Sequence, residues 1–378
     1  MNKLIYFDNA ATTVGKPECV SRAVITALER YANPGRSGHL LSSLAAGEVY
    51  TAREIVCRLF GYDKPENVVF TQNATHALNL AIKGYATDGC HILISNLEHN
   101  SVIRPVHALA NNKHTGITYD VFDATGDESE IIFDFTSKIK PQTTIVVVTL
   151  ASNVCGRILP ISKLASLCHK KGIILICDAS QGAGCVPINV KALGIDVLCF
   201  AGHKGLYGPQ GTGGILFCCN KYPSTIIEGG NGTNSRDKEM SGELPEKLEA
   251  GTLNTPGICG LSAGINYITK IGINEVYQRG NYLIQNLREK LLNIPDITLY
   301  GMYKHQTPTL IFNKKGIMSE ELTEILNKNA ICVRGGLHCA PLAHTALKTG
   351  DNGAVRASLS FKNTISEIEK FCKVVSRI

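Results

Sequence analysis

The stretch IILICDASQGAGCVPINVKALGIDVLCFAGHK, residues 173–204, decides the fold class. It holds two short runs of consecutive apolar residues, 173–178 and 197–200, separated by a longer segment. Unbroken apolar runs rich in Val and Ile are typical of strands that are buried on both faces of a sheet. Four further runs of this kind occur in the sequence, at 68–71, 92–95, 144–150 and 214–217.

Helical patterns lie between these runs, for example at 75–84 and 161–171. Regular alternation of strands and helices predicts an α/β fold with a mostly parallel sheet. The chain contains no internal repeat and no low-complexity tract.

The C-terminal part of the chain has a different organisation. A polar, glycine-rich stretch at 229–236 is followed by a long helical region at 256–293. Strand and helix patterns then alternate again, at 309–312, 319–327, 331–334, 355–361 and 365–378. We therefore expect two domains: residues 1–255 form an N-terminal segment and a large domain, and residues 256–378 form a linking helix and a small α+β domain.

Charge and hydropathy limit the function classes. The net charge is +6, but Lys and Arg are scattered rather than gathered in a block, so we do not expect nucleic-acid binding. The N-terminus lacks the apolar core of a signal peptide, and no segment approaches the ~18 unbroken apolar residues that span a membrane. These features predict a soluble, cytoplasmic protein that does not bind membranes.

The chain has 14 cysteines, and their spacing forms no CxxC pair. A zinc ribbon is therefore not expected, and we predict no metal site. Most of the cysteines lie inside apolar runs, as Cys57, Cys177 and Cys199 do, which is typical of buried, reduced thiols.

Polar residues stand where the predicted strands end, and this is where open α/β sheets bind ligands. Asp178 closes one apolar run; it is either a helix N-cap or the counter-ion of a buried cation. Lys204 follows the next run and precedes a glycine-rich loop. It is either a solvated surface lysine or a lysine that is lifted from solvent to form a Schiff base.

A third group of polar residues joins the run at 68–71 to the following helix and ends in Thr75 and His76. Free N–H groups at such a helix start bind anions. A phosphate there, a carboxylate at Asp178 and an amine at Lys204 together describe a pocket for pyridoxal 5'-phosphate. A dinucleotide is less well supported, because the loop after Lys204 lacks the GxGxxG spacing.

The order of several short motifs resembles the class V, fold-type I aminotransferase superfamily, and within it the cysteine desulfurase and selenocysteine lyase family. The motifs extend over nearly the whole chain: FDNAATT at 7–13, EHNS at 98–101, SN at 152–153, DASQ at 178–181, GHK at 202–204, EAGT at 249–252, RGGLHCA at 334–340 and VR at 355–356.

The resemblance implies roles around the cofactor ring. Lys204 carries pyridoxal phosphate, and Asp178 keeps the pyridine nitrogen protonated. His99 stacks on the ring; without the resemblance, a satisfied surface histidine or a helix N-cap would be the preferred interpretation. Asn153 and Gln181 lie near the ring hydroxyl or the substrate.

It also implies roles at the phosphate and the substrate. Thr75, His76 and His203 bind the phosphate. Thr252 reaches the phosphate of a neighbouring subunit, which predicts a homodimer. Arg356 binds the substrate carboxylate, for which its guanidinium fork is suited.

Cys339 distinguishes the enzymes within this superfamily. Its short loop resembles that of the group II desulfurases, which implies that Cys339 takes sulfur from L-cysteine, leaves L-alanine and passes a persulfide to an acceptor protein. Arg334 is expected beside the thiolate and the substrate. The alternative for Cys339 is one more buried thiol.

Other readings remain open at this stage: a selenocysteine lyase, another class V enzyme, or a non-catalytic scaffold that binds a nucleotide or the cofactor. Two positions depart from the common family pattern. Ala201 stands where many relatives have Ser, and Gly205 is an extra glycine after the lysine.

Overall fold

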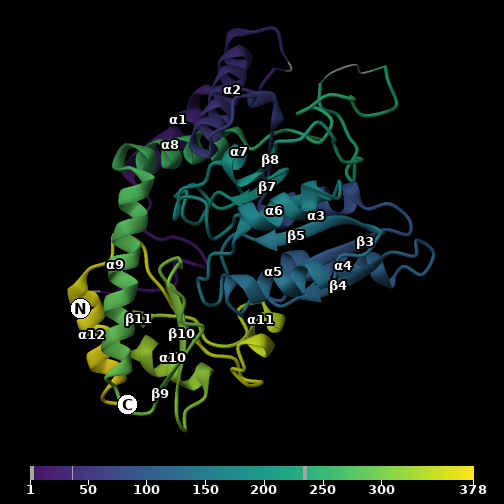
Figure 1. The fold of residues 1–378 in the computed structure, drawn as a ribbon. Helices are drawn as coiled ribbons and strands as arrows, with labels where there is room; N and C mark the ends of the chain where they lie inside the picture. Colours follow the sequence, from purple (N-terminus) through teal and green to yellow (C-terminus); the bar gives the residue numbers. More distant parts are fainter. Residues whose placement is uncertain (1–3, 36, 233–235) are drawn as a thin grey trace.

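The computed structural model describes residues 4–35, 37–232 and 236–378 (Figure 1). The first three residues and part of the predicted glycine-rich stretch, 233–235, lie outside the described residues. Seven strands form the main sheet, in the order β2 (Val68–Thr71), β8 (Gly213–Phe217), β7 (Val197–Ala201), β6 (Ile174–Asp178), β5 (Thr143–Thr149), β3 (His91–Ser95) and β4 (Thr118–Phe122). Strand β8 runs antiparallel to both of its neighbours, and the remaining pairs are parallel.

The predicted α/β class and the mostly parallel sheet are confirmed. The six runs of consecutive apolar residues form strands whose ends differ from the predicted ones by at most one residue. Strand β4 was missed, because it lies at the edge of the sheet and is only partly buried. Its sequence, TYDVF, therefore lacks the continuous apolar character of the central strands.

Helices cover both faces of the main sheet. One face packs against α3 (Ala74–Tyr85) and α4 (Asn100–Asn111). The other packs mainly against α2 (Leu40–Phe60), α5 (Glu128–Ser137), α6 (Ile161–His169) and α8 (Thr255–Ile271). The short helix α7 (Val190–Leu193) precedes β7, a 3-10 turn (Pro65–Asn67) precedes β2, and α1 (Glu18–Arg30) lies along α8.

The long helical region predicted at 256–293 is two helices. Helix α8 ends at Ile271, and α9 (Ile273–Leu292) begins after Gly272, whose φ is 98°. A positive φ is accessible to glycine at little cost, so the chain turns there. In Figure 1, α9 runs from the large sheet to the small one.

The C-terminal unit contains an antiparallel sheet in the order β12 (Val355–Ser358), β10 (Thr309–Lys314), β9 (Ile297–Tyr300). Helices α10 (Ser319–Lys328) and α12 (Ile365–Val375) pack with it, and α11 (Pro341–Ala346) follows the Cys339 loop. Of the predicted strand 331–334, only β11 (Ile331–Cys332) forms; Arg334 makes an isolated bridge to Arg356.

The N-terminal segment also belongs to this core. Strand β1 (Ile5–Tyr6) pairs parallel with β11, and the ring of Phe7 lies 5.5 Å from that of Phe371. Both chain ends therefore lie at the small unit, which the sequence division at residue 255 did not anticipate (Figure 1).

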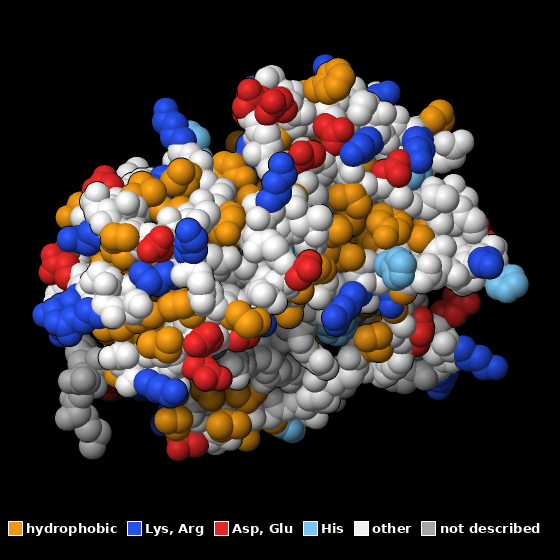
Figure 2. All heavy atoms as spheres, turned by 90° about the horizontal axis from the view of Figure 1, so that it is seen from below, with side chains coloured by type: hydrophobic (Ala, Val, Ile, Leu, Met, Phe, Trp, Pro, Cys, Tyr) orange, Lys and Arg blue, Asp and Glu red, His pale blue; other side chains and the backbone are white. Residues whose placement is uncertain are grey.

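The surface agrees with the scattered charge of the sequence. Figure 2 shows Lys and Arg interspersed with Asp and Glu over the face seen from below, with hydrophobic side chains between them. No helix within the described ranges is both long enough and apolar enough to cross a membrane.

Candidate active site

A cavity of about 220 Å³ lies at the carboxyl edge of the main sheet. The segments that follow β2, β3, β5, β6 and β7 meet there, because parallel strands end at the same edge. The C-terminal unit contributes two arginines and a histidine. The lining includes Asn73, Thr75, His99, Asn153, Asp178, Gln181, Ala201, His203, Lys204, Arg334, His338 and Arg356.

Lys204 lies three residues after the end of β7, and its backbone carbonyl accepts a hydrogen bond from Thr13 Oγ1 at 2.8 Å. Burial lowers the pKa of Lys204 to about 8, Asp178 opposes this shift, and the nearby Arg356 and Arg334 add to it. A lysine with a pKa near 8 has a substantial neutral fraction at physiological pH, as a nucleophilic amine requires.

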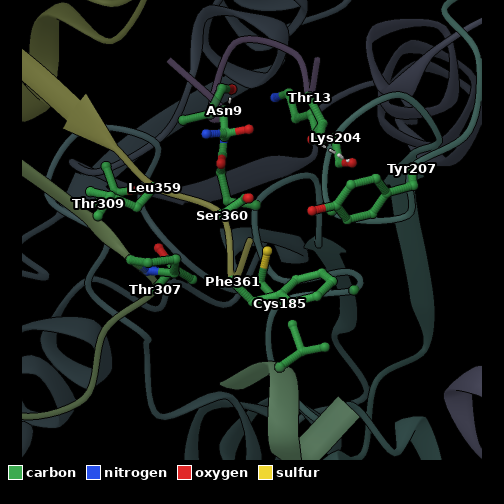
Figure 3. A pocket seen from close by; sticks show the side chains of 16 residues that line it. Asn9, Thr13, Cys185, Lys204, Tyr207, Thr307, Thr309, Leu359, Ser360 and Phe361 are labelled. Atoms are coloured by element: carbon green, nitrogen blue, oxygen red, sulfur yellow. Dashed lines mark hydrogen bonds between the residues drawn. The ribbon is translucent and has the colours of Figure 1, made fainter. Parts of the chain in front are cut away.

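A second, smaller cavity of about 40 Å³ lies against Lys204 (Figure 3). Asn9, Thr13, Cys185 and Tyr207 are among the residues that line it. Burial raises the pKa of Cys185 to about 11, so this neighbour is a neutral thiol. On this side, the Cys185 thiol therefore contributes no negative charge next to Lys204.

Gly205, the unusual residue after Lys204, has a steric explanation. A Cβ atom at this position would lie 2.5 Å from the carbonyl oxygen of Ala183 and 2.8 Å from Cys185 Sγ. The backbone after β6 passes too close to admit a side chain, so the glycine permits the two loops to pack.

Asp178 ends β6 and is 3% exposed. Its Oδ1 accepts hydrogen bonds from Ser180 N at 2.9 Å and Ser180 Oγ at 2.5 Å. The next described helix, α7, begins only at Val190, so Asp178 is not a helix N-cap. Because its side chain lines the cavity beside Lys204, the counter-ion interpretation is favoured.

His99 is a helix N-cap, as considered from the sequence, and it also lies at the cavity. It is the N-cap of α4: its Nδ1 accepts a hydrogen bond from Ser101 N at 3.0 Å, and its ring lines the cavity. Burial, followed by the charge of Lys204, lowers the pKa of His99 to about 4. The ring is therefore neutral, with its proton on Nε2.

Glu98 precedes His99 in the EHNS motif, but the sequence did not indicate a role for it. It is fully buried, and its Oε1 accepts hydrogen bonds from Ser95 Oγ at 2.5 Å and Thr149 N at 2.7 Å. Burial raises the pKa of Glu98 to about 8, so this carboxyl is protonated at neutral pH. It links the end of β3 to the end of β5.

The start of α3 contributes the polar end of the cavity. Asn73 caps the helix through a 2.9 Å hydrogen bond from His76 N to its Oδ1, and Asn73 and Thr75 line the cavity. His203 joins them, with its Nδ1 3.1 Å from Thr12 Oγ1. The His76 side chain does not: it is not part of the lining, and its buried Nε2 has no hydrogen-bond partner in the part of the chain that the structure describes.

Arg356 lies on β12 and is 1% exposed. Its Nη2 donates to Asp8 Oδ1 at 2.8 Å, and its Nη1 donates to the carbonyl of Asn153 at 3.0 Å. Its Nε is buried without a hydrogen-bond partner among the described residues. The ion pair with Asp8 was not anticipated from the sequence.

Two further amide side chains of the lining, Asn153 and Gln181, hold the surrounding chain segments in place. Asn153 Nδ2 donates to the carbonyl of His338 at 2.9 Å, and Gln181 Nε2 donates to the carbonyl of Ala10 at 2.9 Å. Asn153 therefore connects the end of β5 to the Cys339 loop, a link that the sequence did not indicate.

Cys339 is exposed, unlike buried cysteines such as Cys177 and Cys199, whose thiol pKa values burial raises well above the usual value. Its Sγ lies 3.7 Å from Arg334 Nη2, and Arg334 lines the cavity. This position agrees with the predicted loop between a short strand and a helix. Thr252, by contrast, is exposed and is not part of the lining in its own chain.

The residues present fit pyridoxal phosphate. Lys204 offers an amine, Asp178 a carboxylate and the start of α3 an anion site. The buried, unpartnered Nε of Arg356 offers a donor for a further anionic group. His76 is the exception, since its side chain lies outside the lining.

Comparison with known proteins gives a consistent result. The family model described as Aminotransferase class-V matches residues 5–371. A probable cysteine desulfurase of Methanothermobacter thermautotrophicus is 33% identical over 392 residues, which cover 99% of this chain and 94% of that protein. One of Mycolicibacterium paratuberculosis is 30% identical over 383 residues, but the match covers only 55% of its length against 99% of this chain.

Among solved structures, the apo cysteine desulfurase of Thermococcus onnurineus NA1 superposes with a TM-score of 0.90 at 32% identity. The match covers 100% of this chain and 94% of that one. The likeness therefore includes both the large sheet and the C-terminal unit.

Proposed function

Because this chain belongs to the aminotransferase class V family, and has its fold-type I architecture, we propose that it is a pyridoxal phosphate-dependent cysteine desulfurase. It converts L-cysteine to L-alanine and leaves the sulfur atom on Cys339 as a persulfide. One observation carries the proposal within the family: an exposed thiol lies 3.7 Å from an arginine that lines the cavity holding Lys204 and Asp178.

Pyridoxal phosphate, when bound, supplies an electron sink for the pair of electrons released at the substrate Cα. Asp178 would favour the protonated ring nitrogen. Asn73, Thr75 and His203 would hold the phosphate, and the neutral His99 would contact the bound group. His76 contributes through its position in the first turn of α3 rather than through its imidazole.

Lys204 moves the proton at Cα. A pKa near 8 leaves enough neutral amine to act as a base at physiological pH. The same amine would hold the cofactor when it is bound.

Arg356 binds the substrate carboxylate with a guanidinium group that the protein already orients. Asp8 and the Asn153 carbonyl occupy two of its nitrogens, while Nε has no partner among the described residues. Arg334, on the Cys339 side of the cavity, supplies a second positive charge for the substrate and for the attacking thiolate.

The Cys339 thiolate attacks the sulfur atom of the substrate. A bond forms between the two sulfur atoms and the Cβ–S bond breaks, with its electron pair left on Cβ. Protonation of Cβ gives the methyl group of alanine. The overall change is thiol plus cysteine to persulfide plus alanine, so it requires no external oxidant, and the persulfide then passes to an acceptor protein at the exposed loop.

We further propose that the enzyme is a homodimer. Thr252 is exposed and lies three residues after Glu249, which is fixed by a buried ion pair with Arg53 at 2.7 Å. A hollow of about 400 Å³ lies between α2 and the segment around Glu249. Exposed leucines on α2 supply apolar surface for a second copy: Leu40, Leu41 and Leu44. Thr252 would complete the phosphate site of that copy.

We also propose that the protein is cytoplasmic. Its 14 cysteines are all free, as is usual for proteins of this reducing compartment. The large domain, residues 1–255, and the small domain, residues 256–378, are proposed as the main units, with β1 attached to the small one.

The test is an assay of sulfide and alanine release from L-cysteine with a reductant, run beside selenocysteine. Cys339→Ala should keep the cofactor absorbance and lose sulfide release by about a hundredfold or more. Selenide release from selenocysteine can proceed without the thiol and should persist. Cys19→Ala, at another exposed cysteine, is the matched control and should behave like the wild type.

If Cys339→Ala released sulfide as fast as the wild type, a residue other than Cys339 would have to take the sulfur atom from the substrate. A wild type that acts only on selenocysteine would make the protein a selenocysteine lyase.

A further inference from the structure

The backbone of the Cys339 loop is held in a rarely populated conformation. His338 and Cys339, neither of them glycine, both have positive φ values, 50° and 54°. Two consecutive residues in this region require surroundings that hold them there. The carbonyl of Cys339 accepts a hydrogen bond from Asn100 N at 2.7 Å, and that of His338 accepts one from Asn153.

A chain of buried side chains extends from this loop into the C-terminal unit. His338 Nδ1 lies 3.0 Å from His344 Nε2, and His344 Nδ1 lies 2.8 Å from Thr349 Oγ1. At the other end, His338 Nε2 lies 3.0 Å from the carbonyl of Arg334. His338, His344 and Thr349 are 3%, 1% and 7% exposed, so water does not compete for these bonds.

The direction of every bond in this chain is determined. A carbonyl only accepts, so His338 Nε2 carries a proton and donates to Arg334. Burial and the charge of Arg356 lower the pKa of His338 to about 2 and that of His344 to about 4, so both rings are neutral. His338 Nδ1 must then accept from His344 Nε2, and His344 Nδ1 must accept from Thr349.

We propose that His344 is a positioning residue for the Cys339 thiol: its Nε2–H fixes the tautomer and orientation of His338, and through it the left-handed turn that presents Sγ beside Arg334. The proposal rests on the proposed desulfurase function for its kinetic consequence. His344 touches neither the cavity nor the thiol, and it acts on persulfide formation alone. Among the described residues, no hydrogen bond joins Lys204 or Asp178 to this chain of side chains.

The test compares His344→Leu, which removes the donor at similar volume, with His344→Gln, which retains an N–H near the Nε2 position. Persulfide on the Cys339 peptide is followed by mass spectrometry after mixing the holoenzyme with L-cysteine for a single turnover. His344→Leu should slow this step about tenfold, the equivalent of one buried hydrogen bond, whereas His344→Gln should stay within about twofold of the wild type. The KM for cysteine, the cofactor absorbance and selenide release should not change.

His91→Leu is the matched control for losing a buried histidine. His91 is 1% exposed and lies 2.7 Å from Thr143 Oγ1, at the opposite edge of the main sheet. The His91→Leu variant should form persulfide at the wild-type rate, even if its melting temperature falls as much as that of His344→Leu.

A second readout does not require desulfurase activity. Alkylation of Cys339 by iodoacetamide, with exposed Cys19 as the internal reference, should slow in His344→Leu and recover in His344→Gln, because Sγ leaves Arg334 when the turn relaxes. Unchanged persulfide and alkylation rates in His344→Leu, or a His344→Gln as slow as His344→Leu, would overturn the positioning role. A wild type that forms no persulfide would refute the proposed function, while the alkylation ratio would still decide the positioning role.

Discussion

The carboxyl edge of the main sheet and the Cys339 loop are built in different ways. Asp178 is the last residue of the buried strand β6, and Lys204 follows the buried strand β7. The register of these two strands, in which Asp178 pairs with Cys199, fixes their positions. Cys339 lies in an irregular segment with positive φ values, held by single hydrogen bonds from Asn100, Asn153 and His344 through His338. The first region depends on backbone ladders that many residues share, and the second on a few side chains distant in sequence.

This difference predicts two classes of variant. Changes at the sheet edge should abolish every reaction of the bound cofactor, whereas changes at the loop should affect only steps that use the thiol. Measuring sulfide release from cysteine and selenide release from selenocysteine in the same variant distinguishes the two classes. Sheet-edge variants should lose both, and loop variants should lose only sulfide release.

The largest effect is expected for Lys204→Ala. Loss of the base that moves the Cα proton should lower sulfide and selenide release together by about a thousandfold, while the fold and cofactor binding persist. Borohydride reduction of the wild type followed by peptide mapping should locate the pyridoxyl group on Lys204. Lys171→Ala, at an exposed lysine, is the control; a label on Lys171 would place the site elsewhere.

Asp178→Asn should have the next largest effect. The amide keeps an oxygen for the hydrogen bonds from Ser180 but removes the negative charge beside the ring nitrogen, so both releases should slow about a hundredfold. Ser180→Ala keeps the carboxylate and removes one donor, so its effect should be much smaller. Equal losses in the two variants would mean that Asp178 serves mainly to hold the turn.

The sequence predicted the sheet edge better than the loop, for a physical reason. Val197–Ala201 and Ile174–Asp178 are continuous apolar runs, and the residues that follow them must lie at one edge of a parallel sheet. The positions of Lys204 and Asp178 at one edge of the sheet are thus local consequences of the strand pattern, whereas their proposed roles rest on the family resemblance. The break at Gly272 was not predicted, because a single glycine is compatible with a helical pattern.

The loop contacts join residues that no local pattern relates. The Arg356–Asp8 bond spans 348 residues and the Asn153–His338 bond spans 185. The His338–His344 bond spans only six, but positive φ at two non-glycine residues has no sequence signature. The motif therefore indicated Cys339 as a candidate residue, whereas only the structure shows which hydrogen bonds hold its loop.

A pH dependence tests the sheet edge without mutation. The pKa of Lys204 is lowered to about 8, so the neutral amine increases as pH rises through that value. In apoenzyme, the rate of covalent attachment of added pyridoxal phosphate should therefore rise about tenfold from pH 7 to pH 9 and then level off. A rate that keeps rising to pH 10.5 would indicate an ordinary, solvated lysine.

The smallest effect on turnover is expected at Glu98, whose carboxyl group links the ends of β3 and β5. Its pKa is raised by burial from the usual 4.5 to about 8. Below pH 4.5 the carboxyl is protonated in both folded and unfolded chains. As pH rises from 4.5 to 8 the unfolded chain loses this proton while the folded chain keeps it, so the free energy of unfolding decreases over this window and changes no further above about pH 8.

Glu98→Gln removes this dependence and keeps a carbonyl oxygen for the hydrogen bonds from Ser95 and Thr149. The melting temperature of the variant relative to the wild type should therefore increase from pH 5 to pH 8 by several degrees, since the wild type alone is destabilised in this window. Sulfide and selenide release at pH 7 should stay within about twofold of the wild type, because Gln reproduces the neutral side chain that is already present. A difference in melting temperature that is constant with pH would mean that Glu98 is ionised in the folded protein, and a loss of both releases in Glu98→Gln would assign it a direct part in the chemistry of the sheet edge.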